Sequence, residues 1–147
     1  MKKKIKTILI LFLLILLIAV IIYQQVLLSK FTKKLKAGFV YIDTIGDFGW
    51  TYAHEAGRIQ LKNYFKNIDT IYRENVSPDQ FNNVVRDLIE REKCKVIVST
   101  SYSYDHYVID LADKYPDIIF LSCAGFTIKK NLLPYFVDLY QIYYLNG

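Results

Sequence analysis

The chain opens with an apolar run too long for the core of a small globular domain. Residues 8–23 are 16 consecutive apolar residues, and Gln24 and Gln25 are the polar breaks before Leu28. At about 1.5 Å per residue, a helix of this length crosses a bilayer core of about 30 Å. We therefore divide the chain into an N-terminal membrane segment, residues 1–36, and one small domain, residues 37–147.

The membrane segment is either an uncleaved anchor or a removed signal peptide, and we favour the anchor. Cleavage needs small residues after the apolar run, and residues 23–30 offer only Ser29. No cysteine directly follows the run, which argues against lipid attachment. Four lysines on each side leave the positive-inside rule undecided. Because long domains are translocated with little regard to charge, we expect the domain on the extracytoplasmic side of the cell membrane.

The two parts differ in charge. Residues 1–36 hold eight of the 19 basic residues and none of the 14 acidic ones, so the domain has a net charge of −3. This excludes a nucleic-acid surface, which needs clustered basic charge on the folded part. Cys94 and Cys123 fall at expected buried strands and suit small apolar positions, with a disulfide as the alternative. Neither histidine is near them in sequence, so no metal site is predicted.

The domain alternates strand and helix patterns. Its expected strands are 37–42, 69–73, 95–100, 118–122 and 135–137, and its expected helices are 51–67, one from 77, 105–115 and 139–145. Ser77 and Pro78 form a strong helix start. This order with short loops predicts an α/β fold, a parallel sheet with flanking helices.

Two loops follow strands at the carboxyl edge of this sheet, where ligands bind in such folds. In the first, between Gly46 and Trp50, Asp47 could accept hydrogen bonds and Trp50 could stack on a flat ring. The second, residues 99–105, places hydroxyls and aromatic rings before Asp105. The alternatives are that Asp47 and Asp105 cap the following helices and that Trp50 packs into the core.

Catalysis is not predicted. His54 and Glu55 suggest acid–base chemistry, but a solvated helix face is the commoner explanation for such a pair. Ser101 and Ser103 lack the glycine-flanked elbow of a nucleophile. Gly46-x-x-Gly49 lacks the lysine of a phosphate-binding loop. No cofactor is expected.

Residues 46–58, Gly-Asp-Phe-Gly-Trp-Thr-Tyr-Ala-His-Glu-Ala-Gly-Arg, resemble the basic membrane protein (BMP, PnrA-like) family of ABC transporter substrate-binding proteins. The segment Thr-Ser-Tyr-Ser-Tyr-Asp at 100–105 resembles a loop of that family, and 140–147 resembles its Tyr-Gln-x-x-Tyr-Leu-x-Gly helix. The resemblance covers residues 37–147.

The resemblance implies the first lobe of a periplasmic-binding-protein-like fold, which closes on a purine nucleoside or related base and delivers it to an ABC permease. It implies that the aromatic ring of Trp50 stacks on the base, with Asp47 and Thr51 beside it. It also implies cleft positions for Tyr104 and Asp105. With Phe48 and Tyr102 from the same loops, these residues form the expected ligand site.

The chain also departs from the family. Ser103 replaces a glycine, Asp138 stands where a Gly-Arg pair is usual, and the family continues for roughly as long again. We therefore expect a truncated lobe, with binding reduced or lost, or one half of a split protein. The alternative function is a membrane-anchored interaction module that docks a partner chain and binds no small molecule.

Overall fold

The computed structural model describes residues 2–31 and 34–136, and contacts divide the chain into two compact units, Met1–Lys34 and Leu35–Gly147. In the first unit, α1 (Lys2–Phe31) contains a segment, Lys4–Leu27, that is long and apolar enough to cross a membrane. Signal sequences share this property. The expected helix at 139–145 and Asp138 lie outside the described residues.

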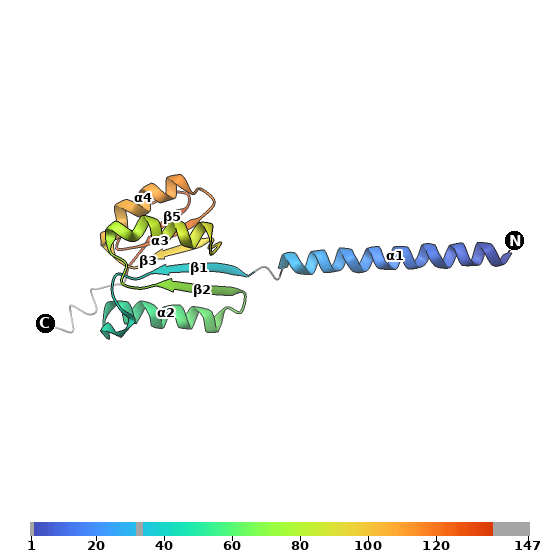
Figure 1. Cartoon of the computed structure of the whole chain (residues 1–147), viewed down its shortest axis with the longest axis horizontal. Helices are drawn as coiled ribbons and strands as arrows, with labels where there is room; N and C mark the ends of the chain where they lie inside the picture. The colour runs from blue at the N-terminus through green and yellow to red at the C-terminus, as the bar shows by residue number, and fades with distance from the viewer. Residues whose placement is uncertain (1, 32–33, 137–147) are drawn as a thin grey trace. The chain divides into compact units, whose positions relative to one another are not determined.

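The second unit, hereafter the lobe, is built on a five-stranded sheet in the order β2-β1-β3-β4-β5 (Figure 1). All four strand pairings are parallel. The strands are β1 (Leu35–Val40), β2 (Ile68–Arg73), β3 (Val96–Ser99), β4 (Ile119–Cys123) and β5 (Leu132–Tyr135). The predicted parallel α/β sheet is therefore confirmed, although β1 and β5 begin two and three residues earlier than expected.

Three helices and two short 3-10 turns connect the strands. They are η1 (Ile45–Asp47), α2 (Trp50–Tyr64), α3 (Pro78–Glu90), η2 (Tyr102–Tyr104) and α4 (Asp105–Lys114). Ser77 is the N-cap residue of α3, as its sequence predicts, and Pro78 is the first helical residue. Figure 1 shows α2 on the opposite side of the sheet from α3 and α4.

The two faces of the sheet carry separate apolar cores, because successive side chains of a strand point to opposite faces. Val40 belongs to the core beneath α3 and α4, together with Phe81 and Val108. Phe39 and Tyr41 belong to the smaller core, against which Leu61 of α2 packs. Among the described residues, α2 is the one helix on this second face.

Candidate functional site

The loops after β1 and β3 meet at one edge of the sheet because all strands run in the same direction (Figure 1). Thr100, which follows β3, donates its hydroxyl to the main-chain oxygen of Val40 at 2.8 Å. This bond joins the ends of two neighbouring strands and fixes the bases of the two loops. We call this side of the lobe the carboxyl edge.

Trp50 is the first residue of α2 and lies at the surface of the carboxyl edge. Its side chain is 42% exposed, and its indole nitrogen donates to the main-chain oxygen of Thr100 at 2.6 Å. The ring of His54, one turn later, lies 4.9 Å from the indole. Trp50 therefore does not pack into the core, and the N-cap residue of α2 is Gly49 rather than Asp47.

Other aromatic side chains at this edge are more exposed than Trp50. Phe48 is 86% exposed and has a left-handed backbone, with φ of 51°. Tyr102 is 62% exposed, and its ring lies 6.5 Å from that of Phe126, which is 85% exposed. Phe136 follows β5, and its ring is 6.2 Å from Trp50. The sequence reasoning did not select Phe126, although its place after Gly125 and the fourth strand is a usable signal.

Two of the expected site residues have buried side chains. Thr51 is fully buried in the first turn of α2. Tyr104 is also fully buried, and its hydroxyl donates to the main-chain oxygen of Val76 at 2.5 Å. Its ring stacks on Phe81 at 4.2 Å, and burial raises its pKa above the usual value. Both residues support the surface loops from below.

Asp105 is the first residue of α4, and the N-cap position belongs to Tyr104. The hydroxyl of Ser122, in β4, donates to the Asp105 carboxylate at 3.0 Å. A side chain at Gly125 would collide with this carboxylate and would meet the Ser122 hydroxyl at 2.9 Å. The Ser122 hydroxyl of β4 thus holds Asp105 in place, and glycine at 125 leaves room for it.

Beneath the first loop lies a buried charged group that corrects one expectation. Glu55 was expected on a solvated face, but it is only 8% exposed and forms two hydrogen bonds with Arg58, at 2.5 and 2.7 Å. Tyr41 donates to the same carboxylate at 2.8 Å, and Arg58 donates to Thr70 at 2.6 Å. The Arg58 hydrogen bonds lower the pKa of Glu55, and burial raises that of Tyr41. This network ties α2 to the residue that follows β1 and to β2.

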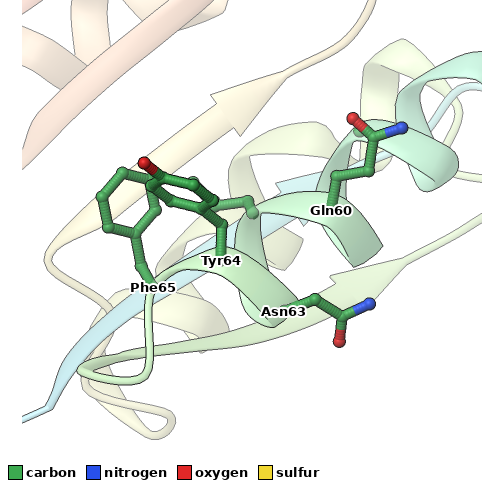
Figure 2. Close-up of a pocket in the computed structure, with 6 residues that line it drawn as sticks. Gln60, Asn63, Tyr64 and Phe65 are labelled. Atoms are coloured by element: carbon green, nitrogen blue, oxygen red, sulfur yellow. The ribbon is translucent and has the colours of Figure 1, made fainter.

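An apolar groove runs beside α2, over the part of the sheet that this helix leaves open. Its volume is about 550 Å³, and Ala53 and Leu61 line it from the helix, with Phe39, Val98 and Leu121 from the strands. A separate hollow of about 630 Å³ lies at the end of α2, where the rings of Tyr64 and Phe65 sit close together (Figure 2). Neither is at the carboxyl edge loops.

The residues within 2–31 and 34–136 contain no cluster of three His, Cys, Asp or Glu side chains that could hold a metal ion. Cys94 and Cys123 are buried free thiols. Burial raises the pKa of Cys94 to about 11 and also raises that of Cys123. Cys123 is the last residue of β4 and Cys94 lies two residues before β3, and both take the place of small apolar residues.

The chain is similar to known substrate-binding proteins. The model of the family described as ABC transporter substrate-binding protein PnrA-like matches residues 34–147. A purine-binding protein of Brucella abortus is 35% identical over 118 residues, which are 78% of this chain and 33% of the relative. A protein of Haloferax volcanii named as an ABC transporter glucose-binding protein is 30% identical over 113 residues, 77% of this chain and 29% of the relative.

A comparison with solved structures also finds substrate-binding proteins with the same fold. A solved ABC transporter solute-binding protein from Conexibacter woesei superposes with a TM-score of 0.67 at 19% identity, over 76% of this chain and 38% of its own. The chain thus spans about a third of the length of the curated relatives that it matches. With the family model covering the whole lobe, the chain belongs to the PnrA-like (Bmp) family of ABC transporter substrate-binding proteins.

Proposed function

We propose that the carboxyl edge is one wall of a ligand cleft that binds a flat, uncharged ring compound, a purine nucleoside or base. The observation that carries this proposal is Trp50, whose ring is partly exposed while its indole nitrogen is fixed to Thr100. A ring that is already held in place loses little conformational freedom when a ligand stacks on it. Aromatic stacking adds about 1 kcal/mol beyond the buried area.

The charge of the carboxyl edge restricts the kinds of ligand that it can bind. The segments that form the carboxyl edge, residues 41–49, 74–79 and 100–105, contain five acidic residues and no Lys or Arg. An acidic wall disfavours a phosphorylated ligand and provides acceptors for the hydroxyl and amino donors of a nucleoside. The neutral nucleoside therefore fits this edge better than a nucleotide does.

The expected site residues take two roles. Phe48, Trp50 and Tyr102 provide exposed rings, Asp105 provides a carboxylate acceptor, and Asp47, in η1, is the further acidic residue that we assign to the ligand. Thr51 and Tyr104 act from beneath, by holding the loop backbones that carry these groups. The name of the Brucella relative supports a purine, whereas that of the Haloferax relative leaves a sugar as the competing ligand.

The whole receptor needs more than this lobe. A ligand that binds between two lobes gains much of its affinity from burial on both sides, so one lobe alone should bind more weakly than the whole receptor while still giving a measurable response. We place the lobe on the extracytoplasmic face of the cell membrane, held by α1, where it would hand its ligand to an ABC permease. The span of Lys4–Leu27 and the family membership support this location.

The apolar groove beside α2 favours a second candidate, an anchored interaction module without a small ligand. An open apolar surface over a sheet is suited to a helix, because helices cover sheets in layered folds. The occupant we favour is a helix from the remaining two thirds of a substrate-binding protein, since this chain matches 33% of its Brucella relative. In this case the groove, and not the carboxyl edge, would carry the function.

Trp50 is the one tryptophan of the chain, so its fluorescence reports on the carboxyl edge alone. The full chain in lipid nanodiscs would be titrated with adenosine, guanosine, inosine and glucose. Saturable quenching by a nucleoside, absent with glucose, supports the proposal. A chain that is folded by circular dichroism yet gives no response contradicts it and favours the interaction module. Tyr64→Ala, at the other end of α2, is the matched control and should leave the titration unchanged.

A further inference from the structure

The opposite edge of the sheet, where the strands begin, has the reverse charge. It is formed by residues 34–36, 62–69, 90–95, 113–119 and 129–131, which are the starts of strands and the ends of helices. These segments contain ten basic and five acidic residues, a net charge of +5. We call this side the amino edge. The lobe therefore has an acidic edge and a basic edge, although its overall charge is small.

The basic side chains of the amino edge are available to a partner. Lys62, Lys66, Lys93 and Lys95 are exposed. Two of the five acids, Glu92 and Asp113, form ion pairs with lysines of the same edge, at 2.6 Å each. Part of the acidic charge is thereby neutralised locally, and the exposed lysines determine the potential that a partner meets.

Apolar side chains accompany this charge. Tyr64 is 80% exposed and Phe65 is 43% exposed, with their rings 4.8 Å apart in an edge-on contact at the end of α2 (Figure 2). Leu35 and Ile119, at the starts of β1 and β4, are 40% and 47% exposed. Aromatic rings next to lysines are the composition of surfaces that lie in the interface of a bilayer.

The short connection between α1 and β1 indicates that the partner of the amino edge is a membrane surface. β1 begins at Leu35, four residues after α1 ends at Phe31. Four residues span at most about 14 Å when fully extended. Leu35 donates its main-chain N–H to Asn67 at 2.9 Å, which fixes the point of entry to the start of β2 and to the end of α2. If α1 is inserted in a membrane, this edge is the part of the lobe that stays within reach of its surface.

We propose that the amino edge rests on an anionic lipid surface, with Lys62, Lys66, Lys93 and Lys95 at the head groups and the Tyr64–Phe65 pair in the interface. This inference rests on the proposed membrane anchor. Its consequence is a defined orientation: the carboxyl edge, with Trp50, faces away from the lipid to which the chain is tethered. An anionic ligand would be repelled from one edge and attracted to the other.

A label on each edge tests the orientation. The full chain carrying Asn63→Cys, labelled with an environment-sensitive dye, would be placed in phosphatidylcholine nanodiscs with and without phosphatidylglycerol, together with nitroxide-bearing lipid as a quencher. The native thiols are buried, so the new cysteine reacts selectively. Asp79→Cys, exposed at the start of α3, is the comparison at the carboxyl edge. We expect quenching at position 63 that requires phosphatidylglycerol and weakens with salt, and little quenching at 79.

Variants that each remove one positive charge test whether the lysines bind the amino edge to the anionic surface. Lys62→Gln and Lys66→Gln should each lower the affinity of the edge for the anionic surface by about fivefold. Arg86→Gln removes an exposed charge in the middle of α3 and should leave quenching unchanged. Equal quenching at positions 63 and 79, or quenching at 63 that is independent of phosphatidylglycerol, would overturn the inference. Extraction of the chain from vesicles by alkaline carbonate would instead refute the anchor, and this inference with it.

Discussion

The indole nitrogen of Trp50 donates a hydrogen bond to the main-chain oxygen of Thr100 at 2.6 Å, which joins the first residue of α2 to the end of β3. The two residues are 50 positions apart in sequence. Through this contact, the ring that we assign to the ligand is aligned by the neighbouring strand. Its orientation therefore depends on the sheet as well as on the loop that carries it.

Trp50→Phe separates the hydrogen bond from the ring. The variant keeps an aromatic surface but loses the indole donor, so we expect the free energy of unfolding to fall by about 1 kcal/mol. Urea unfolding of the detergent-solubilised chain, followed by circular dichroism, would measure this. Calorimetric titration should show a weaker nucleoside affinity for Trp50→Ala than for Trp50→Phe. Equal affinities in the two variants would refute the stacking role.

Tyr104→Phe distinguishes support from ligand contact. The buried hydroxyl of Tyr104 bonds to Val76, so its removal should lower the free energy of unfolding by about 1 kcal/mol and leave nucleoside affinity nearly unchanged. Tyr102→Ala, at an exposed ring, should do the reverse: affinity falls while stability is maintained. An affinity loss in Tyr104→Phe without a stability loss would mean that the hydroxyl contacts the ligand.

Glu55→Gln leaves the buried guanidinium of Arg58 without its anionic partner, so we expect destabilisation of about 3 kcal/mol. The folded-state pKa of Glu55 lies below its usual value because Arg58 stabilises the ionised form. Its contribution is therefore complete above the ordinary glutamate pKa of about 4.3 and is lost as the pH falls through the folded-state pKa.

Thermal melting between about pH 3 and pH 7 tests this sign, because the native chain should lose stability towards acid more steeply than Glu55→Gln does. Glu92→Gln is a matched control at a solvated ion pair with Lys36, where we expect a small change. Parallel pH profiles for the native chain and Glu55→Gln would contradict the linkage.

Gly125→Ala places a methyl group against the Asp105 carboxylate and the Ser122 hydroxyl, with an expected loss of about 1–3 kcal/mol in unfolding free energy. Gly57→Ala is the comparison, since open space surrounds that position within α2. There we expect a gain of about 0.5–1 kcal/mol, because alanine favours the helix. Denaturant midpoints of the two variants should shift in opposite directions; a neutral Gly125→Ala would mean that Asp105 moves freely.

Thiol reactivity reports on the core. Burial raises the pKa of Cys94 to about 11, so almost no thiolate exists at pH 8, and Cys123 is shifted in the same direction. A thiol reagent should react slowly with the native chain at that pH and rapidly once urea unfolds it. Fast reaction of the native chain would show that the sheet opens on the timescale of the assay.

The architecture was predictable because its signals are local. The continuous apolar run at 37–42, which overlaps β1, and the serine–proline start of α3 each specify their element without reference to the rest of the chain. The motif around Trp50 similarly identified a surface loop. Boundaries shifted by a few residues where the pattern carries no stop signal, as at the start of β5.

The burial of Glu55 could not be predicted, because a carboxylate in a helix is usually solvated and its partner Tyr41 belongs to another segment, directly after β1. Tyr104 is a similar case: its inward direction depends on the ring of Phe81, 23 residues earlier in the sequence. Such contacts join residues of different helices and strands, so neither the hydropathy pattern nor the spacing of residues along the sequence predicts them.

Because all strands run in the same direction, the chain enters each strand at the amino edge and leaves it at the carboxyl edge, and the strand length sets the distance between the two. The six residues of β1, at about 3.3 Å each, separate the point where the chain enters the lobe from the Trp50 edge by roughly 20 Å. In an antiparallel sheet of the same size, every second loop would return to the edge where the chain enters, so the loops would not all be kept at this distance from it. A deletion of two residues in every strand would shorten this spacing, whereas no change in loop sequence could.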